Sequence, residues 1–249
     1  MRYKLSAPAT LHTTIQLPAS KSISNRALIL HALAQGHIAP SNLSDCDDTC
    51  VMIKALDGNP GHIDILAAGT AMRFLTAYLS VTPGTRIITG TERMQQRPIR
   101  ILVDALRELG AQIEYAGKEG FPPLSITGTE LTGEEISLAG NVSSQYISAL
   151  LMIGPILKNG LRLNLTGEII SRPYINLTLQ LMKEFGADAA WSSESSITVR
   201  PSKYKDIPFT VESDWSGASY WYQMVALILD NEKEESTKTE IKLPGLLPR

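Results

Sequence analysis

Two cations stand at an unusual place in the stretch LPASKSISNRALIL, which runs from Leu17 to Leu30. Small polar residues open this stretch and apolar residues end it, so the pattern predicts that a helix begins where Lys21 and Arg26 lie. Cations are unfavourable there, because the positive end of the helix dipole is at the N-terminus. A bound phosphate or carboxylate would remove the conflict. Lys21 and Arg26 are therefore predicted to hold an anion, and removing either should weaken binding without lowering stability.

The same kind of helix start recurs along the chain. Later apolar helices are expected to begin at GTAMR from Gly69, at SSQ from Ser143 and at DWSGAS from Asp214, and two more starts carry Arg97 and Arg172 before a proline. Any single start has an ordinary explanation, since Ser and Thr cap helices and Arg is common on surfaces. The recurrence favours an anion site that several helix N-termini share.

This recurrence reflects an internal repeat of about 75 residues. GTRIITG from Gly84 corresponds to GLRLNLTG from Gly160, and RPIRILVDALRELGA from Arg97 corresponds to RPYINLTLQLMKEFGA from Arg172. Each unit reads as an apolar helix, a strand, an amphipathic helix that begins at proline, and two further strands. The sequence thus predicts an α/β fold of βαβαββ units, with three copies and the start of a fourth. In the first copy the second part, DDTCVMIKALDGNPGHIDI, is degenerate.

Composition and charge restrict the function classes. The chain has 249 residues and a net charge of −2, which argues against a general nucleic-acid or membrane binder. No apolar run reaches the ~18 residues of a membrane span, and the N-terminus lacks the apolar segment of a signal peptide, so a cytoplasmic protein is expected. Cys46 and Cys50 read as two ordinary thiols; half of a metal site is the less favoured alternative, because no second ligand pair is nearby.

Five segments together resemble one enzyme family. LPASKSISNRALILHALAQG, AGTAMRFL, QRPI, VSSQYISALLM and SRPYINLTLQLMKEFG are similar, in this order, to the 5-enolpyruvylshikimate-3-phosphate (EPSP) synthases. The combination of S-K-S-x-S-N-R, S-S-Q and S-[KR]-P-Y is specific to that family. The UDP-N-acetylglucosamine carboxyvinyltransferases share its fold, but their first motif reads Lys-Asn where this chain has Lys21-Ser22. This relative is therefore the disfavoured alternative.

The resemblance implies a domain organisation. The family has two similar domains, each built from three βαβαββ copies, with helix N-termini that point into the cleft between them. Residues 14–211 would then form a three-repeat substrate-binding domain. Residues 1–13 would be a strand of the second domain, and residues 212–249 its truncated start. On this interpretation the chain is an N-terminal portion, inactive on its own, and further catalytic carboxylates lie in the missing domain.

The resemblance also implies a reaction. The enolpyruvyl group of phosphoenolpyruvate would be transferred to the 5-hydroxyl of shikimate 3-phosphate with release of phosphate, a step of the shikimate pathway that leads to chorismate and the aromatic amino acids. No metal or organic cofactor is implied. The partners would be these two small molecules, with no nucleic acid and no membrane, and the full-length enzyme would be monomeric. The alternative from another class is a non-catalytic anion-binding domain that holds shikimate 3-phosphate weakly.

Roles carry over to individual residues by this resemblance. Lys21 would contact both substrates and take part in proton transfer, and Thr70 and Arg73 would support the turn at Gly69. The residues implied for shikimate 3-phosphate are Lys21, Ser22, Arg26, Ser143, Ser144, Gln145, Ser171 and Tyr174. Those implied for phosphoenolpyruvate are Lys21, Gly69, Arg97 and Gln145.

Two residues depart from the family pattern. Ala67 stands where the family has Asn, which puts one polar contact to phosphoenolpyruvate in doubt. Phe74 stands where the family often has Pro, behind the turn at Gly69. Glyphosate competes with phosphoenolpyruvate in this family, and Gly69 and Phe74 occupy positions that tune its inhibition.

Overall fold

Two four-stranded sheets of identical topology form the outer layers of the main body. The computed structural model describes residues 12–58, 60–231 and 240–247. The first sheet has the strand order β2-β3-β5-β4 and the second has the order β6-β7-β9-β8. In each sheet the first pair is parallel and the other two pairs are antiparallel. The strands are β2 (His62–Asp64), β3 (Gly84–Thr89), β4 (Gln112–Tyr115), β5 (Leu124–Gly128), β6 (Glu135–Ala139), β7 (Leu161–Thr166), β8 (Ala189–Trp191) and β9 (Ser196–Val199).

Each sheet belongs to one βαβαββ unit, as the repeat predicts. The first unit contains α3 (Gly69–Ser80) and α5 (Arg100–Glu108), with the short α4 (Glu92–Gln95) between them. The second contains α6 (Ser144–Ile153), the 3₁₀ turn η1 (Gly154–Ile156) and α7 (Arg172–Glu184). The predicted α/β fold class is confirmed. Gly-Ala follows both amphipathic helices, and Gly110 (φ +100°) and Gly186 (φ +88°) adopt the left-handed conformation that ends a helix.

The structure differs from the expected repeat in two places. α5 begins at Arg100 rather than at Pro98, because the Ile99 N–H donates to the Gly120 carbonyl at 2.9 Å and the preceding residues form α4. The first copy supplies α1 (Lys21–Leu33) and α2 (Asp47–Leu56), but its described residues form no four-stranded sheet of their own. The sequence predicted His62–Asp64 as the end of the first copy. This strand pairs with β3, so it is the first strand of the second copy.

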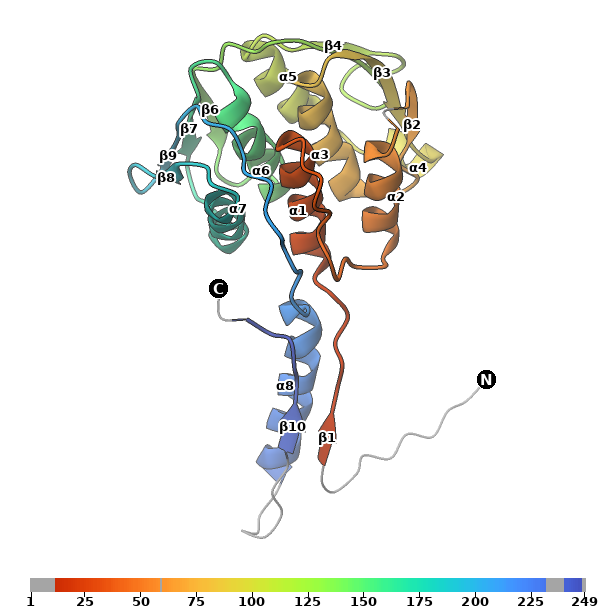
Figure 1. Ribbon diagram of the computed structural model, residues 1–249, viewed down its shortest axis with the longest axis vertical. Helices are drawn as coiled ribbons and strands as arrows, with labels where there is room; N and C mark the ends of the chain where they lie inside the picture. Colours follow the sequence, from red (N-terminus) through yellow and green to blue (C-terminus); the bar gives the residue numbers. More distant parts are fainter. Residues whose placement is uncertain (1–11, 59, 232–239, 248–249) are drawn as a thin grey trace.

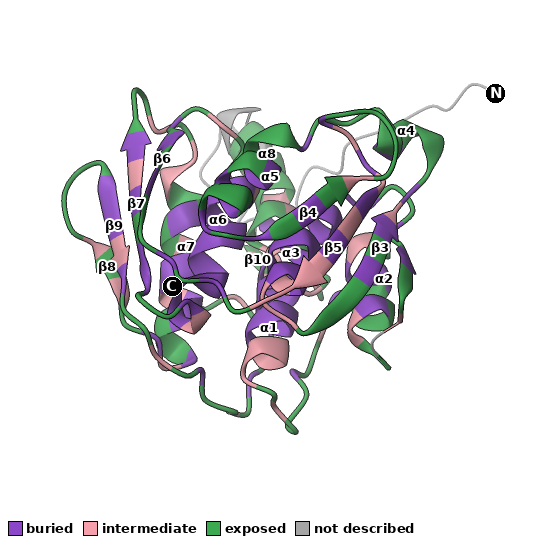
Figure 2. Cartoon of the chain, turned by 90° about the horizontal axis from the view of Figure 1, so that it is seen from above, coloured by how far each residue is buried: buried purple, intermediate pink, exposed green. Residues whose placement is uncertain are grey.

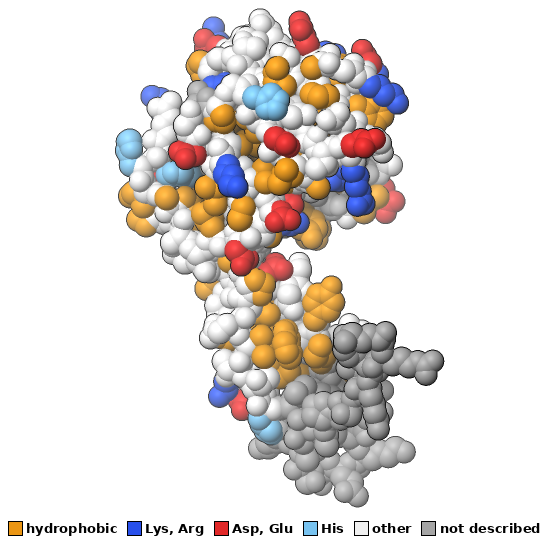
Figure 3. All heavy atoms as spheres, turned by 90° about the vertical axis from the view of Figure 1, so that its right-hand side faces the viewer, with side chains coloured by type: hydrophobic (Ala, Val, Ile, Leu, Met, Phe, Trp, Pro, Cys, Tyr) orange, Lys and Arg blue, Asp and Glu red, His pale blue; other side chains and the backbone are white. Residues whose placement is uncertain are grey.

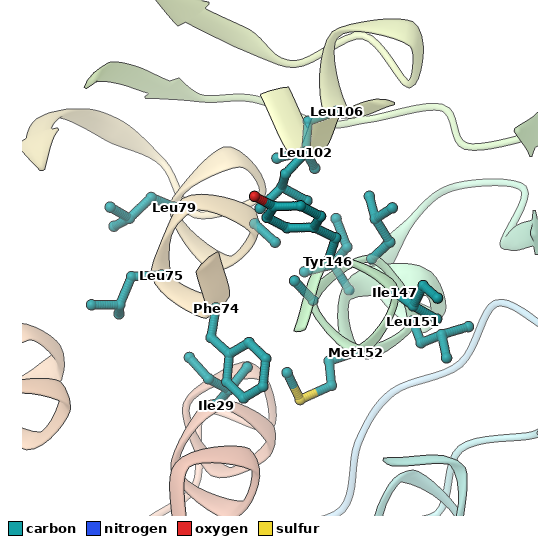
Figure 4. Packing of buried hydrophobic residues seen from close by; sticks show 14 of the residues in the cluster. Ile29, Phe74, Leu75, Leu79, Leu102, Leu106, Tyr146, Ile147, Leu151 and Met152 are labelled. Carbon is teal, nitrogen blue, oxygen red and sulfur yellow. The ribbon is translucent and has the colours of Figure 1, made fainter. Parts of the chain in front are cut away.

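Three helices, α1, α3 and α6, lie between the two sheets and form the centre of the core (Figure 2). Their sequences are apolar on nearly every side, as expected for helices that protein surrounds completely. In α1 every residue from Ile23 to Leu30 is buried. Phe74 of α3 is 1% exposed and lies beside Ile29 of α1 and Met152 of α6 (Figure 4). The position where the family often has Pro is thus filled by a core side chain, at the junction of all three helices.

A segment without helix or named strand, residues 200–213, packs on the core through its buried side chains Tyr204, Phe209 and Val211. Ser41, after α1, forms an isolated bridge with Thr210, and its N–H donates to the Phe209 carbonyl at 2.9 Å. The Phe209 ring packs against that of Phe185, the C-cap residue of α7, at 5.4 Å between centroids. The first and last parts of the body are joined in this way.

A narrower part of the molecule extends from the main body (Figure 1). It consists of β1 (His12–Thr14), α8 (Trp215–Asn231) and β10 (Glu240–Lys242), and β1 pairs with β10 in parallel. The expected first strand, residues 1–13, lies outside the described residues except for its last two. Within the described part of the chain, no helix is both long and apolar enough to cross a membrane.

Large hydrophobic side chains are exposed on α8. Trp215, Tyr220, Tyr222, Met224 and Leu227 are 45–67% exposed. Hydrophobic side chains gather on the surface of this part of the molecule (Figure 3). α8 therefore lacks the packing that stabilises α1, α3 and α6.

We expect backbone amides of residues 218–227 in α8 to exchange with solvent much faster than those of α1, α3 and α6. Helical hydrogen bonds with few buried contacts open locally at a small free-energy cost, whereas core helices open only with global unfolding. Hydrogen–deuterium exchange of the 249-residue chain, resolved by residue, measures this. Protection of α8 equal to that of the core helices would contradict it.

Candidate anion-binding site

The N-terminal turns of five helices meet at one pocket. Its volume is about 440 Å³, and its lining combines the starts of α1, α3, α6 and α8 with one residue from the first turn of α7. The lining residues are Lys21, Ser22, Arg26, Thr70, Ser143, Ser144, Gln145, Tyr174, Asp214 and Ser216. Residues from the start of each repeat, up to 195 positions apart (Lys21 and Ser216), are thus brought together as the sequence predicts.

The backbone gives this pocket a positive potential. None of the five helices has an acidic residue in its first turn, whereas α2 and α4 both do. The N-cap residues of α1 and α3, Ser20 and Ala68, make no side-chain capping bond. Side-chain caps are found at α6, where Ser143 accepts from the Gln145 N–H at 3.3 Å, and at α8. Positive dipole ends and first-turn N–H groups that converge in this way form a site for an anion.

The structure argues against the expectation that Arg26 can be removed without loss of stability. Arg26 lies in the second turn of α1, is only 3% exposed and joins three helices. Its Nε donates to Thr178 Oγ1 of α7 at 2.7 Å, its Nη2 to Ser148 Oγ of α6 at 3.0 Å, and its Nη1 to the Ser22 carbonyl at 2.9 Å. Arg26 is therefore part of the core as well as of the pocket wall, and its removal must affect stability.

The charge of Arg26 is buried without a carboxylate partner. Burial lowers the pKa of Arg26 to about 10, although Tyr174 acts in the opposite direction. The guanidinium lies 5.3 Å from the centroid of the Phe74 ring, an attractive cation–π arrangement. Among the described residues, no acidic side chain forms an ion pair with Arg26. A buried, uncompensated cation is costly, so an anion in the pocket would be bound strongly.

Lys21 is the exposed cation of the pocket. It is the first residue of α1 and, in the described part of the chain, forms no ion pair. Across the pocket, Gln145 Nε2 donates to Thr70 Oγ1 at 3.2 Å, which ties the start of α6 to the start of α3. Cation, hydroxyls and amide thus surround the same space.

A second cavity adjoins the turn at Gly69. Its volume is about 500 Å³, and Ala67, Arg93, Met94 and Arg97 line it. A Cβ at Gly69 would collide with Nη1 of Arg97 and lie 3.0 Å from Nη1 of Arg73, so only glycine allows this approach. Ala67 lines this cavity and Thr70 lines the first, so both cavities adjoin the same turn.

The cations at this turn repel each other. Arg73 is 5% exposed and donates from Nη1 to the Gly69 carbonyl at 2.9 Å, while its buried Nε has no hydrogen-bond partner among the described residues. Burial first, and then the charge of Arg73, lowers the pKa of Arg97. Two guanidinium groups so close together favour an anionic ligand in the space that Arg97 lines.

Gly69→Ala is expected to weaken anion binding at this turn about tenfold, which corresponds to ~1.4 kcal/mol, with phosphoenolpyruvate as the probe. The added Cβ displaces the guanidinium of Arg97, and the flexible end of that side chain can move without disturbing the core. Gly61→Ala is the matched control, because no atom lies within 4 Å of a Cβ at Gly61. Calorimetric titration and thermal melting of both variants test this; loss of stability with unchanged affinity would contradict it.

Not every predicted residue lines the pocket. Ser171 is the N-cap of α7 but is not part of the lining, and it makes no side-chain capping bond. Arg172 was predicted to bind the anion at a helix start, but it does not line the pocket. Its Nη2 donates to the Glu194 carbonyl at 2.6 Å, and its guanidinium lies 4.3 Å from the Trp191 ring centroid. Arg172 therefore fastens α7 to the β8–β9 hairpin.

Sequence reasoning missed three polar or charged lining residues. Asp214 and Ser216 belong to the start DWSGAS, whose similarity to the other helix starts was the available signal. Asp214 Oδ2 accepts from the Gly217 N–H at 3.1 Å and so caps α8. Arg93 in the second cavity gave no such signal, because it precedes the proline motif by several residues.

The two cysteines lie beside α2 and outside both cavities. Cys46 is its N-cap and Cys50 is exposed in its first turn, and both are free thiols. Among the described residues, no group of three or more His, Cys, Asp or Glu side chains could hold a metal ion.

Known proteins share both the sequence and the fold. A sequence profile of EPSP synthase (3-phosphoshikimate 1-carboxyvinyltransferase) matches residues 5–58 and 59–233. The 3-phosphoshikimate 1-carboxyvinyltransferase of Bacteroides fragilis is 72% identical over 246 residues, which cover 99% of this chain and 58% of the relative. The enzyme of that name from Shewanella halifaxensis is 40% identical over 84% of this chain and 55% of the relative.

A solved structure supports the fold. The EPSP synthase of Acinetobacter baumannii superposes with a TM-score of 0.74 at 22% identity, over 85% of this chain and 52% of that protein. The chain thus spans somewhat more than half the length of the relatives that it matches. The profile covers nearly all of the chain, and on this basis the chain belongs to the EPSP synthase (3-phosphoshikimate 1-carboxyvinyltransferase) family.

Proposed function

We propose that this chain provides the binding surface for shikimate 3-phosphate and phosphoenolpyruvate in a 3-phosphoshikimate 1-carboxyvinyltransferase. The observation that carries the proposal is the convergence of five helix N-termini on one pocket with Lys21 and Arg26, both without a carboxylate partner among the described residues. Such a pocket matches a ligand with a phosphate and a carboxylate. Because the chain belongs to this family, we propose shikimate 3-phosphate as the ligand of the pocket.

The two cavities suggest how the substrates divide the site. In the proposal, shikimate 3-phosphate occupies the pocket with Lys21, Ser22, Arg26, Ser143, Ser144, Gln145 and Tyr174, and Ser171 completes its phosphate site once ligand is bound. Phosphoenolpyruvate lies at Gly69 and Arg97. Gln145 is proposed to contact both substrates, because its Nε2 donates to Thr70 Oγ1 at the Gly69–Thr70 turn, and Lys21 of the same pocket is proposed to do so as well.

The proposed reaction forms a bond between the 5-hydroxyl oxygen of shikimate 3-phosphate and C2 of phosphoenolpyruvate, and then expels phosphate from C2. The hydroxyl loses a proton, the methylene carbon gains one on addition, and this carbon loses a proton again on elimination. Cations fixed around the phosphates and the carboxylate stabilise the charge without reorganisation. Lys21 is the proposed proton-transfer group of this chain, because it is the one exposed cation in the described lining of the pocket.

We propose the following domain division. Residues 14–211 form the substrate-binding domain, while residues 1–13 and 212–249 belong to a second domain. The narrowing of the molecule before β1 and α8, and the exposed apolar side chains of α8, support this division (Figure 1).

The 249-residue chain is expected to bind substrate without turning it over. Asp214 is the one carboxylate in the described lining of the pocket, and its Oδ2 accepts from the Gly217 N–H as the cap of α8, so this carboxylate already has a structural role. A phosphate-release assay with both substrates measures turnover. Release above the rate without protein would contradict this expectation.

The acceptor can be identified by thermal melting with candidate ligands. Shikimate 3-phosphate at about 100 times its dissociation constant should stabilise the chain by ~2.7 kcal/mol, a shift of roughly 5–10 °C. Shikimate, which lacks the phosphate, should give a much smaller shift. A shift with UDP-N-acetylglucosamine but none with shikimate 3-phosphate would replace the proposal by the UDP-sugar reaction, and no shift with either would refute it.

A further inference from the structure

Asp48 connects α2 to the turn at Gly69. Its Oδ1 accepts a hydrogen bond from the backbone N–H of Thr70, the second residue of α3, at 3.1 Å. The first-turn N–H groups of a helix have no partner within the helix, and the residue before α3, Ala68, has no side chain that could accept one. Asp48 thus supplies, from a neighbouring helix, the acceptor that α3 lacks.

The first turn of α2 is itself fixed to α1. Thr49, which is fully buried, donates from Oγ1 to Asn25 Oδ1 at 2.8 Å. Just before α2, the Ser44 N–H donates to Ser24 Oγ at 2.9 Å. The position of Asp48 is therefore set by the helix that carries Lys21 and Arg26.

The turn that Asp48 holds adjoins both cavities. The Thr70 side chain accepts the bond from Gln145, and Gly69 faces Arg97. The charge of Asp48 also acts on Arg97: burial and Arg73 lower the pKa of Arg97, and Asp48 raises it. Asp48 has two effects on an anion, since its charge repels the ligand while its hydrogen bond keeps the turn in place.

We propose that Asp48 is a positioning residue, which holds the Gly69–Thr70 turn in the geometry that binds phosphoenolpyruvate. It acts through Thr70 and does not touch the ligand. The choice of ligand rests on the proposed function, but the hydrogen bond and the order it imposes on the turn do not. Because charge and hydrogen bond affect anion binding in opposite directions, substitutions at Asp48 can separate them.

Four variants of the 249-residue chain make this separation. Asp48→Ala removes the acceptor and the charge, whereas Asp48→Asn removes the charge and keeps an oxygen acceptor, and Asn caps helices as well as Asp does. Asp47→Ala and Asp47→Asn are the matched controls. Asp47 is the preceding residue of the same helix turn and is exposed, and its side chain forms none of the hydrogen bonds or ion pairs seen among the described residues.

Two measurements are made on each variant: amide exchange at Thr70 by NMR, and binding of phosphoenolpyruvate by calorimetry. Asp48→Ala should speed exchange at Thr70 and weaken binding about tenfold, because a smaller fraction of molecules holds the turn in place. Asp48→Asn should keep both values within about threefold of wild type or bind slightly more tightly. The Asp47 variants should change neither.

The outcomes that would overturn the proposal are the following. If Asp48→Ala binds phosphoenolpyruvate as tightly as Asp48→Asn, or more tightly than wild type, Asp48 acts through its charge alone and the proposal is wrong. Unchanged exchange at Thr70 in Asp48→Ala also overturns it. If the wild-type chain binds no phosphoenolpyruvate, the proposed function fails, while exchange at Thr70 still decides whether Asp48 holds the turn.

Discussion

Arg26→Ala should melt roughly 4–8 °C below the wild-type chain. The substitution removes three hydrogen bonds to a charged group and leaves a cavity among α1, α6 and α7, and release of the buried charge offsets only part of this loss. A net cost of about 2 kcal/mol corresponds to that change in a chain of this length. Thermal melting without ligand is the measurement.

Two further variants show whether the loss of stability comes from the buried position of Arg26 or from the removal of an arginine as such. Arg26→Met keeps much of the packed volume and removes the charge, so it should lose less stability than Arg26→Ala and still lose binding of shikimate 3-phosphate. Arg100→Ala removes an exposed arginine, also at a helix start, whose ion pair with Glu119 is solvent-accessible, and it should shift melting by less than about 2 °C. Unchanged or higher stability of Arg26→Ala would show that the buried network contributes nothing.

Lys21→Ala should have the opposite profile, with stability kept and binding lost. An exposed cation leaves the positive end of a helix dipole, where each charge is worth roughly 0.3–1 kcal/mol, so melting without ligand should stay the same or rise slightly. A lost charge-assisted contact of about 1.5–3 kcal/mol weakens binding of shikimate 3-phosphate by roughly 10- to 150-fold. Melting and calorimetry together measure this.

Lys183→Ala is the control for Lys21→Ala. Lys183 is an exposed lysine in the last turn of α7, so its removal changes the net charge equally but takes away a favourable helix-dipole contact. Its affinity for shikimate 3-phosphate should equal that of wild type. Equal loss of affinity in both variants would mean that net charge, rather than the position of Lys21, controls binding.

The sequence predicted the repeat because its signals are local. Gly110 and Gly186 end helices through their own backbone conformations, and Pro173 marks the start of α7 through its own ring. The same kind of signal, Pro98, predicted the start of α5 at the wrong residue. The helix begins at Arg100, because the Ile99 N–H donates to the Gly120 carbonyl, a contact that the local sequence does not show.

The double role of Arg26 could not be predicted for the opposite reason. Its partners Ser148 and Thr178 are 122 and 152 positions away, and neither stands out in the sequence. The sequence shows a cation near a helix start, but only the packing of α1 against α6 and α7 decides that this cation is buried. Asp48 is similar, since a carboxylate in the first turn of α2 looks like an ordinary partner of the dipole of its own helix.

The convergence of helix N-termini on an anion can be tested by NMR titration of the 249-residue chain with shikimate 3-phosphate and, separately, with shikimate. We expect shikimate 3-phosphate to shift backbone amides most strongly in the first turns of α1, α3 and α6, at Ser22, Thr70, Ser144 and Gln145, and shikimate to shift them far less. Shifts of equal size with both ligands, or the largest shifts outside these helix starts, would contradict the account.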